Sequence, residues 1–457
     1  MITNRHSMRR AAIAGIAGLL LVASCSSDAG TTKPVATGAP ASAAPTDAPT
    51  TDSASTDAPT TDAPTTDAPT TEPAVPAKSP VVIAAIIDAT GPSSGPPQGA
   101  EIIQAWGTFI NAKGGINGHP VTIEVADNGG DAAKSQTILD EMVAKKPVMI
   151  LLESASTESS IAEGLGKSGI PILGVGYNPA VWGGDIEAFQ LHCSTDPGAP
   201  VPCALPNAFT LTTTFGAVVD EQVLAAQSVG AKTLVTAACA EVDSCSQAAP
   251  VFSTTAAALG LTDLGVVKVS SSAPDYNAEC IQWVQQGVDF IQLSLGGAAG
   301  AKIFSDCTDQ GYTGTFGASA GSVRGELITT EGIKLAGGLN AFPWWVDDAP
   351  VVEYRDALNA AGLKDDAIND PTATGIWGAL QLFAKANANL GDDPTAAEAL
   401  DNMYTVKDET LDGLIAPVTF TKGELATHRP CFWPFVLEDG KFTNPLGGLK
   451  YQCYPAQ

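Results

Sequence analysis

The chain has 457 residues, of which 44% are hydrophobic, and its formal net charge at pH 7 is −26. A surface this acidic repels phosphate backbones, which argues against a nucleic-acid-binding protein. Beyond the N-terminal segment, no stretch approaches the roughly 20 uninterrupted apolar residues of a membrane-spanning helix, so we expect no such helix.

The first 24 residues have the layout of a bacterial secretory signal. Arg9 and Arg10 precede an apolar run, residues 11–21, that is too short to span a membrane. The run leads into Val-Ala-Ser-Cys at residues 22–25, which resembles a lipobox, the motif whose cysteine receives a diacylglycerol. We predict a lipoprotein signal peptide over residues 1–24 and a lipid on Cys25. The alternative is a plain secretory signal with an incidental cysteine.

The next segment is compositionally distinct. Residues 26–78 are almost only Thr, Ala, Pro, Ser and Asp, and they lack the large apolar side chains that would offset the entropy of ordering. Residues 25–78 are therefore predicted to be a lipidated, disordered tether that anchors the protein to the outer face of the cell membrane. The signal contributes a charge of +3 and the tether −5, so residues 79–457 carry −24.

The remaining chain alternates short apolar runs with stretches of helical periodicity, which predicts parallel sheets covered by helices. The first strands are expected at residues 81–87, 121–125, 148–152 and 170–173. The helices between and after them are expected at residues 100–112, 134–145 and 156–168. These elements are predicted to form the first part of one α/β lobe.

The same alternation of predicted strands and helices resumes after residue 208 and indicates a second lobe. Its strands are expected at residues 233–236, 264–269, 290–293 and 314–317, and its helices at 216–228, 247–259, 278–286 and 300–310. Two later helices are expected at 351–361 and 372–390, before a β-rich tail that includes 417–420 and 434–438. The fold class is therefore α/β with two lobes.

Cysteine usage fits an exported protein. Of nine cysteines, eight remain when Cys25 is set aside, and disulfides persist outside the cytoplasm. Proximity in the sequence favours four pairs: Cys193 with Cys203, Cys239 with Cys245, Cys280 with Cys307, and Cys431 with Cys453. Other pairings stay open, since eight cysteines allow on the order of a hundred connectivities. The chain has no C-x-x-C motif and only four scattered histidines, so we expect no metal.

Candidate binding residues follow the predicted strands, because ligands of open α/β sheets bind outside the carboxyl ends of the strands. The strongest candidates are Ser154, Ser156 and Thr157, hydroxyl residues at a strand-to-helix junction that suits an anion or carbonyl group. The alternative for each is an ordinary helix cap. Tyr177 lies in a later glycine-rich loop and would cover a ligand. Ser294 and Ser319 occupy the corresponding strand ends of the second lobe.

Nucleotide-binding motifs are absent. No glycine-rich segment matches a phosphate-binding loop or a dinucleotide fingerprint. None of the few histidines follows a predicted strand with a partner for a catalytic triad. We therefore expect a protein that is not an enzyme and that needs no cofactor.

Three segments together resemble a known family. They are Ile-Ile-Asp-Ala-Thr-Gly-Pro at residues 86–92, Asn-Ala-Lys-Gly-Gly-Ile-Asn-Gly at 111–118 and Ser-Ala-Ser-Thr at 154–157. These are similar to the leucine/isoleucine/valine-binding family of type I periplasmic binding proteins. Weaker similarity at residues 170–172, 289–291 and 436–441 extends the resemblance over nearly all of residues 79–457.

The resemblance implies two Rossmann-like lobes with parallel-rich sheets, joined by a hinge of three crossings. By motif, the N-terminal lobe takes residues 79–208 and 338–416, and the C-terminal lobe takes 209–337 and 417–457. The family's residues at the positions of Ser154, Ser156, Thr157 and Tyr177 grip a ligand carboxylate. The implied function is a monomeric substrate-binding protein of an ABC importer. Its partners are a transporter permease and a small polar or carboxylate-bearing molecule, such as an amino acid, an amide or a related compound.

One departure bears on the ligand. Amino-acid binders of the family commonly place an acidic residue after a second-lobe strand to pair with the ligand ammonium, whereas this chain has Ala-Ser-Ala at residues 318–320. An unpaired buried ammonium costs several kcal/mol, so a plain α-amino acid would need Asp88, Glu153 or Asp243 as a substitute. A ligand-sensing or adhesive envelope lipoprotein of the same fold, uncoupled from transport, stays open as an alternative.

Overall fold

The computed structural model describes residues 78–90, 98–154, 156–174, 176, 179–182, 205–211, 215–240, 249–423, 427–428 and 431–453. These residues all belong to the unit Pro73–Gln457. The predicted signal peptide, Cys25 and nearly all of the tether lie outside the described residues, so these predictions stay untested.

The first sheet contains five parallel strands in the order β2-β1-β3-β4-β5. In chain order they are β1 (Val81–Ile87), β2 (Val121–Asp127), β3 (Met149–Glu153), β4 (Ile172–Gly174) and β5 (Ala208–Thr210). Six of the seven residues of β1 are buried, which explains why its sequence is a continuous apolar run. Strands covered on both faces have no polar side to alternate with.

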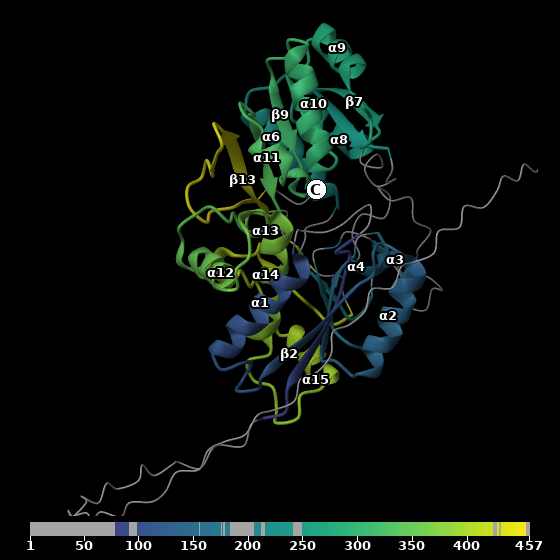
Figure 1. The fold of residues 1–457 in the computed structure, drawn as a ribbon, viewed down its shortest axis with the longest axis vertical. Coiled ribbons are helices and arrows are strands. Elements are labelled where there is room, and N and C mark those ends of the chain that lie inside the picture. The colour runs from purple at the N-terminus through teal and green to yellow at the C-terminus, as the bar shows by residue number, and fades with distance from the viewer. Residues whose placement is uncertain are drawn as a thin grey trace, which may run out of the picture. The chain divides into compact units, whose positions relative to one another are not determined.

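Helices cover both faces of this sheet. They are α1 (Gly99–Ala112), α2 (Ala132–Ala144), α3 (Glu158–Ser168), α4 (Pro179–Trp182), α12 (Ala349–Ala360), α13 (Asp365–Ile368), α14 (Pro371–Ala386) and α15 (Ala396–Met403). Figure 1 shows α1 and α14 on one side of the strands, and α2 and α3 on the other. Side chains of Asp131, Asp370 and Thr395 cap α2, α14 and α15, because each accepts a hydrogen bond from an N–H of the first turn.

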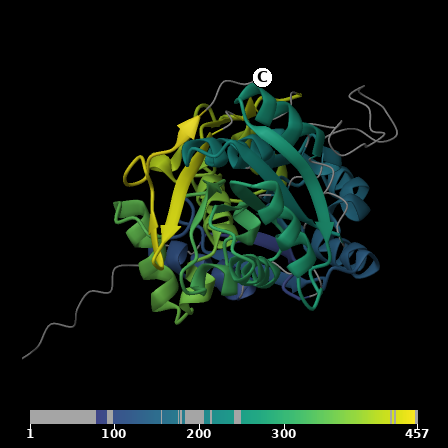
Figure 2. The ribbon, with the colours of Figure 1, turned by 90° about the horizontal axis from the view of Figure 1, so that it is seen from above.

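The second sheet contains eight strands and is parallel except at one edge. Its strands are β6 (Thr233–Cys239), β7 (Thr262–Val269), β8 (Phe290–Ser294), β9 (Thr315–Ala318), β10 (Leu335–Leu339), β13 (Cys431–Glu438), β14 (Lys441–Thr443) and β15 (Gln452–Cys453). The main path runs β14-β13-β10-β9-β8-β6-β7, and β15 also pairs with β13. The antiparallel C-terminal strands, yellow in Figure 2, lie at the edge opposite the teal strand β7.

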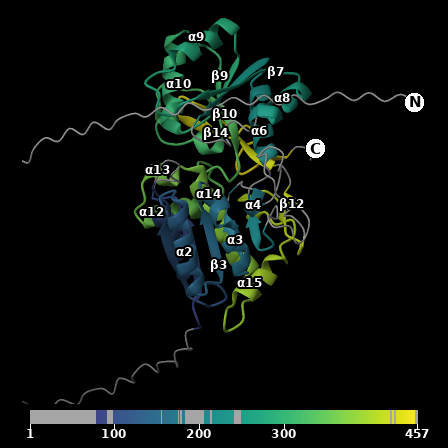
Figure 3. The same ribbon diagram turned by 90° about the vertical axis from the view of Figure 1, so that its right-hand side faces the viewer.

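Helices also cover this sheet on both faces. They are α6 (Phe215–Ser228), α8 (Ala249–Ala258), α9 (Asn277–Gln286), α10 (Gly297–Asp309) and α11 (Glu326–Thr329), with a 3-10 turn, η1, at Ala320–Ser322. Figure 3 shows α9 and α10 on one side of the strands, and α6 and α8 on the other. The layers explain the amphipathic pattern of α9, whose Cys280 and Trp283 are buried.

The chain passes between the two sheets three times: after β5, after β10 and before β13. Helices α12 and α14 follow β10 but pack against α1, which belongs to the layer of the first sheet. A short turn, η2 (Leu411–Gly413), and a separate antiparallel pair, β11 (Val418–Thr419) with β12 (Thr427–His428), precede β13. The predicted α/β fold of two parallel-rich sheets and three crossings is confirmed.

Two of the four predicted disulfides are confirmed. Cys280–Cys307 joins α9 to α10, and Cys431–Cys453 joins β13 to β15. Cys239 is disulfide-bonded as well. Cys193, Cys203 and Cys245 lie outside the described residues, so the pairs that include them stay predictions.

Some predicted boundaries were wrong, and some elements were missed. The helix expected at 156–168 begins at Glu158, and the one expected at 372–390 ends at Ala386, where Asn387 closes the last turn. The sequence analysis missed β5, β10, α15 and the short strands β14 and β15. Of these, β10 matters most, because it is the strand that joins the parallel part of the second sheet to β13.

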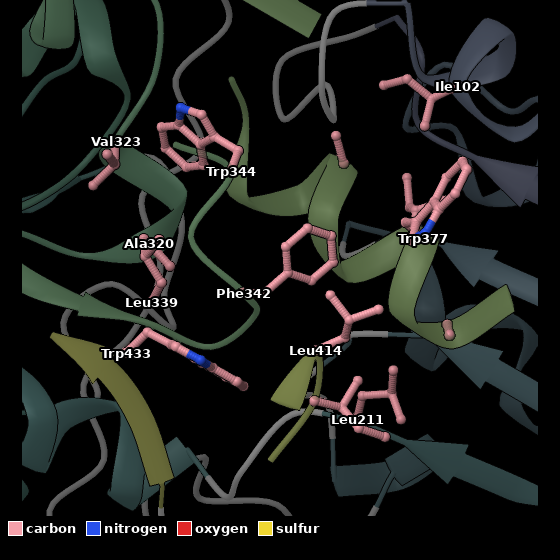
Figure 4. Packing of buried hydrophobic residues seen from close by; sticks show 14 of the residues in the cluster. Ile102, Leu211, Ala320, Val323, Leu339, Phe342, Trp344, Trp377, Leu414 and Trp433 are labelled. Atoms are coloured by element: carbon pink, nitrogen blue, oxygen red, sulfur yellow. The ribbon is translucent and has the colours of Figure 1, made fainter. Parts of the chain in front are cut away.

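One large cluster of buried apolar side chains includes residues from both sheets. Figure 4 shows part of it, including Trp377 of α14, Phe342 from the segment after β10, and Trp433 of β13. The ring of Phe342 lies 5.2 Å from that of Tyr354, which in turn lies 5.3 Å from that of Trp377. The segment after β10 is therefore packed into the core rather than exposed.

Two glycines of β10 make room for aromatic side chains of β13. A Cβ atom built on Gly337 would lie 2.5 Å from the carbonyl oxygen of Ala318 and 2.6 Å from the ring of Phe435. A Cβ on Gly338 would lie 2.7 Å from the ring of Phe432. A larger side chain at Gly337 must displace the backbone of β9 and the Phe435 ring, and one at Gly338 must displace the Phe432 ring.

We expect Gly337→Ala to lower the free energy of unfolding by about 1–3 kcal/mol, the usual cost of overpacking a core. Gly321→Ala is the matched control, since Gly321 is exposed and a Cβ there meets no atom within 4 Å. Urea denaturation measures both. Equal stability of the two variants would show that β13 moves without cost.

Candidate functional site

Both sheets contain the same topological switch point. The first sheet has the order β2-β1-β3-β4-β5, and the parallel part of the second sheet repeats it as β7-β6-β8-β9-β10. In such sheets two neighbouring strands have connections that run in opposite directions along the sheet, and this pair forms the topological switch point. Ligands bind outside the carboxyl ends of that pair. The pairs are β1 with β3 and β6 with β8, so the candidate site lies at their carboxyl ends.

At the first switch point a buried carboxylate binds the predicted hydroxyl residues. Asp88 follows β1 and is only 2% exposed. Its Oδ1 accepts a hydrogen bond from Ser154 Oγ at 2.5 Å, and its Oδ2 accepts from Ser156 Oγ at 2.6 Å and from Ser156 N at 3.3 Å. Both carboxylate oxygens are thus bound by the segment that follows β3.

A second group of polar side chains supports these hydroxyls from behind. Asn128 Nδ2 donates to Ser154 Oγ at 2.5 Å and lies 3.2 Å from Thr157 Oγ1. Thr157 Oγ1 lies 2.6 Å from Ser154 Oγ and 2.9 Å from Ser135 Oγ. We call these six residues the Asp88 network: Asp88, Asn128, Ser135, Ser154, Ser156 and Thr157.

The three predicted hydroxyl residues therefore lie together, but their exposure differs. Ser154 and Thr157 are each 1% exposed, and their hydroxyl oxygens contact other members of the network. Ser156 is exposed. Ser156 is thus the member of the three that presents its side chain to solvent, while the other two position it and Asp88. Tyr177 lies outside the described residues.

The sequence analysis missed Asn128 and Ser135 as members of this site. Asn128 directly follows β2, so the rule that polar residues after strands line the site would have found it. Ser135 lies in the first turn of α2, and its sequence context gives no such signal. Asp88 was considered only as a possible partner for a ligand ammonium, not as the acceptor for Ser154 and Ser156.

Asp127, the last residue of β2, fixes the loop beside Asp88. It accepts hydrogen bonds from the N–H groups of Ala89 and Gly129, both at 2.9 Å, and from Thr90 Oγ1 at 2.6 Å. Burial by itself would raise the pKa of Asp127, but these hydrogen bonds outweigh it and lower the pKa below its ordinary value. The carboxylate is therefore ionised at neutral pH and holds the loop in place.

The second switch point carries serines and an amide. Ser294, the last residue of β8, donates from Oγ to Gln222 Oε1 of α6 at 3.2 Å. Ser319 follows the neighbouring strand β9, and its Oγ lies 2.8 Å from Ser322 Oγ of η1. Both predicted serines are half-buried and lie at the carboxyl ends of adjacent strands. The structure places them where the sequence analysis expected.

Buried charges lie close to this second switch point. The Arg324 side chain, which follows η1, forms an ion pair with Asp370 of 3.3 Å between Nε and Oδ2 and donates from Nη2 to Thr372 Oγ1 at 2.8 Å. Burial raises the pKa of Asp370, and Arg324 offsets part of that increase. On α6, burial raises the pKa of Glu221 well above its ordinary value.

Neither a metal cluster nor a membrane-spanning helix occurs among the residues that the structure describes. They contain no group of three or more His, Cys, Asp or Glu side chains placed to hold a metal ion. None of their helices combines the length and the apolar composition required to cross a membrane. An open hollow of about 560 Å³ lies beside Phe109 of α1 and Val352 of α12, away from the strand ends of both switch points.

The sequence pattern of the periplasmic binding protein family matches residues 80–440. The chain belongs to this family. No curated protein sequence matches the chain. Solved structures of solute-binding and substrate-binding proteins with 15–18% identity share its fold, which agrees with the type I fold predicted from the sequence.

Three of these structures illustrate the range of ligands that their descriptions name. A leucine-binding protein of Thermotoga maritima is 17% identical with a TM-score of 0.60, covering 80% of this chain and 97% of its own. A benzoate-bound solute-binding protein of R. palustris is 15% identical with a TM-score of 0.59, covering 81% and 96%. A fatty-acid transporter's substrate-binding protein of Thermomonospora curvata is 18% identical with a TM-score of 0.61, covering 80% and 91%.

We expect Ser154→Ala to lower the free energy of unfolding of the ligand-free protein by about 1–3 kcal/mol, because it removes the donor to Asp88 Oδ1 and the nearest acceptor of Asn128 Nδ2, both buried. Ser159→Ala, an exposed serine on α3, is the control and should change stability by less than about 0.5 kcal/mol. Urea denaturation at pH 7 measures both. A loss no larger than that of the control would mean that the network is not a stability element.

Proposed function

We propose that the chain is the extracytoplasmic solute-binding protein of an ABC importer, which captures a small polar molecule between two lobes. The observation that carries this proposal is the repeated strand order, which gives each sheet one switch point with polar residues at its carboxyl ends. The proposed lobes are residues 79–208 with 338–416 and residues 209–337 with 417–457. The family match supports the proposal, because periplasmic binding proteins share this fold.

In this proposal the ligand contacts both switch points. Ser156 presents the exposed hydroxyl of the first one, and Ser154 and Thr157 hold it in position. Ser294 and Ser319 contribute from the second sheet, and Tyr177 covers the ligand. A ligand that contacts both lobes stabilises the closed arrangement over the open one, which is how capture is coupled to closure.

The identity of the ligand does not follow from related structures. The similar proteins are described with leucine, benzoate or fatty acid, which differ in charge, size and polarity. At 15–18% identity these likenesses concern the fold. We therefore propose a small polar molecule, such as an amino acid, an amide or a related compound, and no enzymatic activity.

The N-terminal segments are proposed to hold the protein at the membrane. Residues 1–24 direct export, Cys25 carries the lipid, and residues 26–78 act as a flexible tether for a monomeric binding domain. A tether of this composition lets the domain reach the permease of the importer while it stays bound to the membrane. The two confirmed disulfides agree with a location outside the cytoplasm.

A ligand library tests capture. It contains amino acids together with matched amines, primary amides and carboxylates on isobutyl and benzyl skeletons. A true ligand at a hundredfold excess over its dissociation constant should stabilise the protein by about 2.7 kcal/mol, seen as a rise in the melting temperature. Ser156→Ala and Ser294→Ala should each weaken that binding about tenfold, and the exposed Ser159→Ala should not. Binding that neither variant changes would place the site elsewhere.

Removal of the lipid site tests the anchor. We expect Cys25→Ala to move the protein from the membrane fraction to the soluble envelope fraction or the medium, because the tether alone has no apolar surface to hold it there. Cell fractionation and immunoblotting measure the distribution, with Cys25-containing protein as the control. A variant that stays with the membrane would contradict lipid anchoring at this residue.

A further inference from the structure

We infer that the first switch point accepts a hydrogen-bond donor of the ligand, such as an ammonium, amide N–H or hydroxyl group, and disfavours a carboxylate. This inference rests on the proposed function, because it names the chemical group that Ser156 would contact. It differs from the expectation based on resemblance, in which the hydroxyls at Ser154, Ser156 and Thr157 grip a ligand carboxylate. The difference arises from Asp88.

The hydroxyl protons of Ser154 and Ser156 are already hydrogen-bonded within the protein. A serine hydroxyl has one proton to donate, and an ionised carboxylate accepts only. Ser154 and Ser156 both donate to Asp88, at 2.5 and 2.6 Å. The exposed Ser156 hydroxyl therefore presents lone pairs to solvent, and it acts toward a ligand as an acceptor.

The backbone donors nearby are committed as well. Helix N-termini bind anions through N–H groups that lack a partner. Here Ser156 N donates to Asp88 Oδ2 at 3.3 Å, and the N–H groups of Thr157 and Glu158 both donate to the carbonyl oxygen of Ser154 at 3.1 Å. These three N–H groups before and at the start of α3 are thus bonded within the protein and are not available to a ligand carboxylate.

The charge of the Asp88 carboxylate also disfavours a ligand carboxylate at this site. The Asp88 carboxylate is 2% exposed and lies directly behind the Ser156 hydroxyl. A ligand carboxylate that touched Ser156 would face a second negative charge across one hydroxyl group, in a region where burial weakens screening by water. An ammonium or amide donor would instead gain from the polarised hydroxyl, whose acceptor strength rises when its proton is bound by a carboxylate.

Asp88 is therefore the residue that decides whether the first switch point prefers a hydrogen-bond donor or a carboxylate of the ligand. We call this the end-group preference. Asp88→Asn keeps the size of the side chain, removes the charge and leaves fewer acceptors for the two serine protons. The exposed hydroxyl of Ser156 would then be able to donate to a ligand. The matched control is Glu163→Gln, which removes one negative charge from an exposed position on α3, the helix that follows Ser156 and Thr157.

The experiment uses the mature full-length protein and the best-binding skeleton of the library, as its amine, primary amide and carboxylate. Isothermal titration at pH 7 should show that the amine or amide binds wild-type and Glu163→Gln protein at least about tenfold more tightly than the carboxylate. In Asp88→Asn this ratio should fall at least about tenfold. Ser156→Ala should weaken the amine or amide and leave the carboxylate unchanged.

The outcomes separate this inference from the proposal on which it rests. A carboxylate that binds the wild-type protein more tightly than its matched amine and amide would overturn the end-group inference while it supports capture. The end-group inference is also overturned if Asp88→Asn folds, by its melting curve, and keeps the wild-type ratio. A library in which no compound binds would contradict capture itself and the inference with it.

Discussion

A buried carboxylate must be surrounded by hydrogen-bond donors, and that requirement organises the carboxyl edge of the first sheet. Asp88 follows β1, its donors come from the segment after β3, and those donors are supported by Asn128 after β2 and Ser135 of α2. One charged group thus ties three strand ends and a helix together. The switch point is consequently fixed in shape before any ligand arrives, which lowers the entropy cost of binding.

The first sheet was the part of the fold most accessible to sequence analysis. Strands β1 and β3 are continuous apolar runs because both of their faces are covered, and such runs were recognised within one or two residues. The position of the hydroxyl-rich segment after β3 followed from the same rule. Which of its hydroxyls would be exposed did not follow, because Ser154 finds its partners in Asp88 and Asn128, which are 66 and 26 residues away in the chain.

The second sheet contains a strand, β10, that its local sequence does not predict. The run Leu335–Leu339 contains Gly337 and Gly338, which have low strand propensity, and no strand was predicted there. It is a strand because Phe432 and Phe435 of β13 fill the space above those glycines. The information that makes β10 a strand therefore lies in aromatic residues near the end of the chain, and no pattern within residues 335–339 contains it.

The pairing of β10 with β13 also governs the order in which the molecule can be completed. The strand β13 comes late in the chain, yet it lies between β10 and β14 and is cross-linked to β15 by Cys431–Cys453. A chain emerges from synthesis N-terminus first, so β10 is an unprotected edge strand until β13 has emerged as well. Open edges of this kind pair with other chains. Synthesis of this chain therefore includes an interval in which nearly all of the domain has emerged but its second sheet is still unfinished, and protection from aggregation is most needed then.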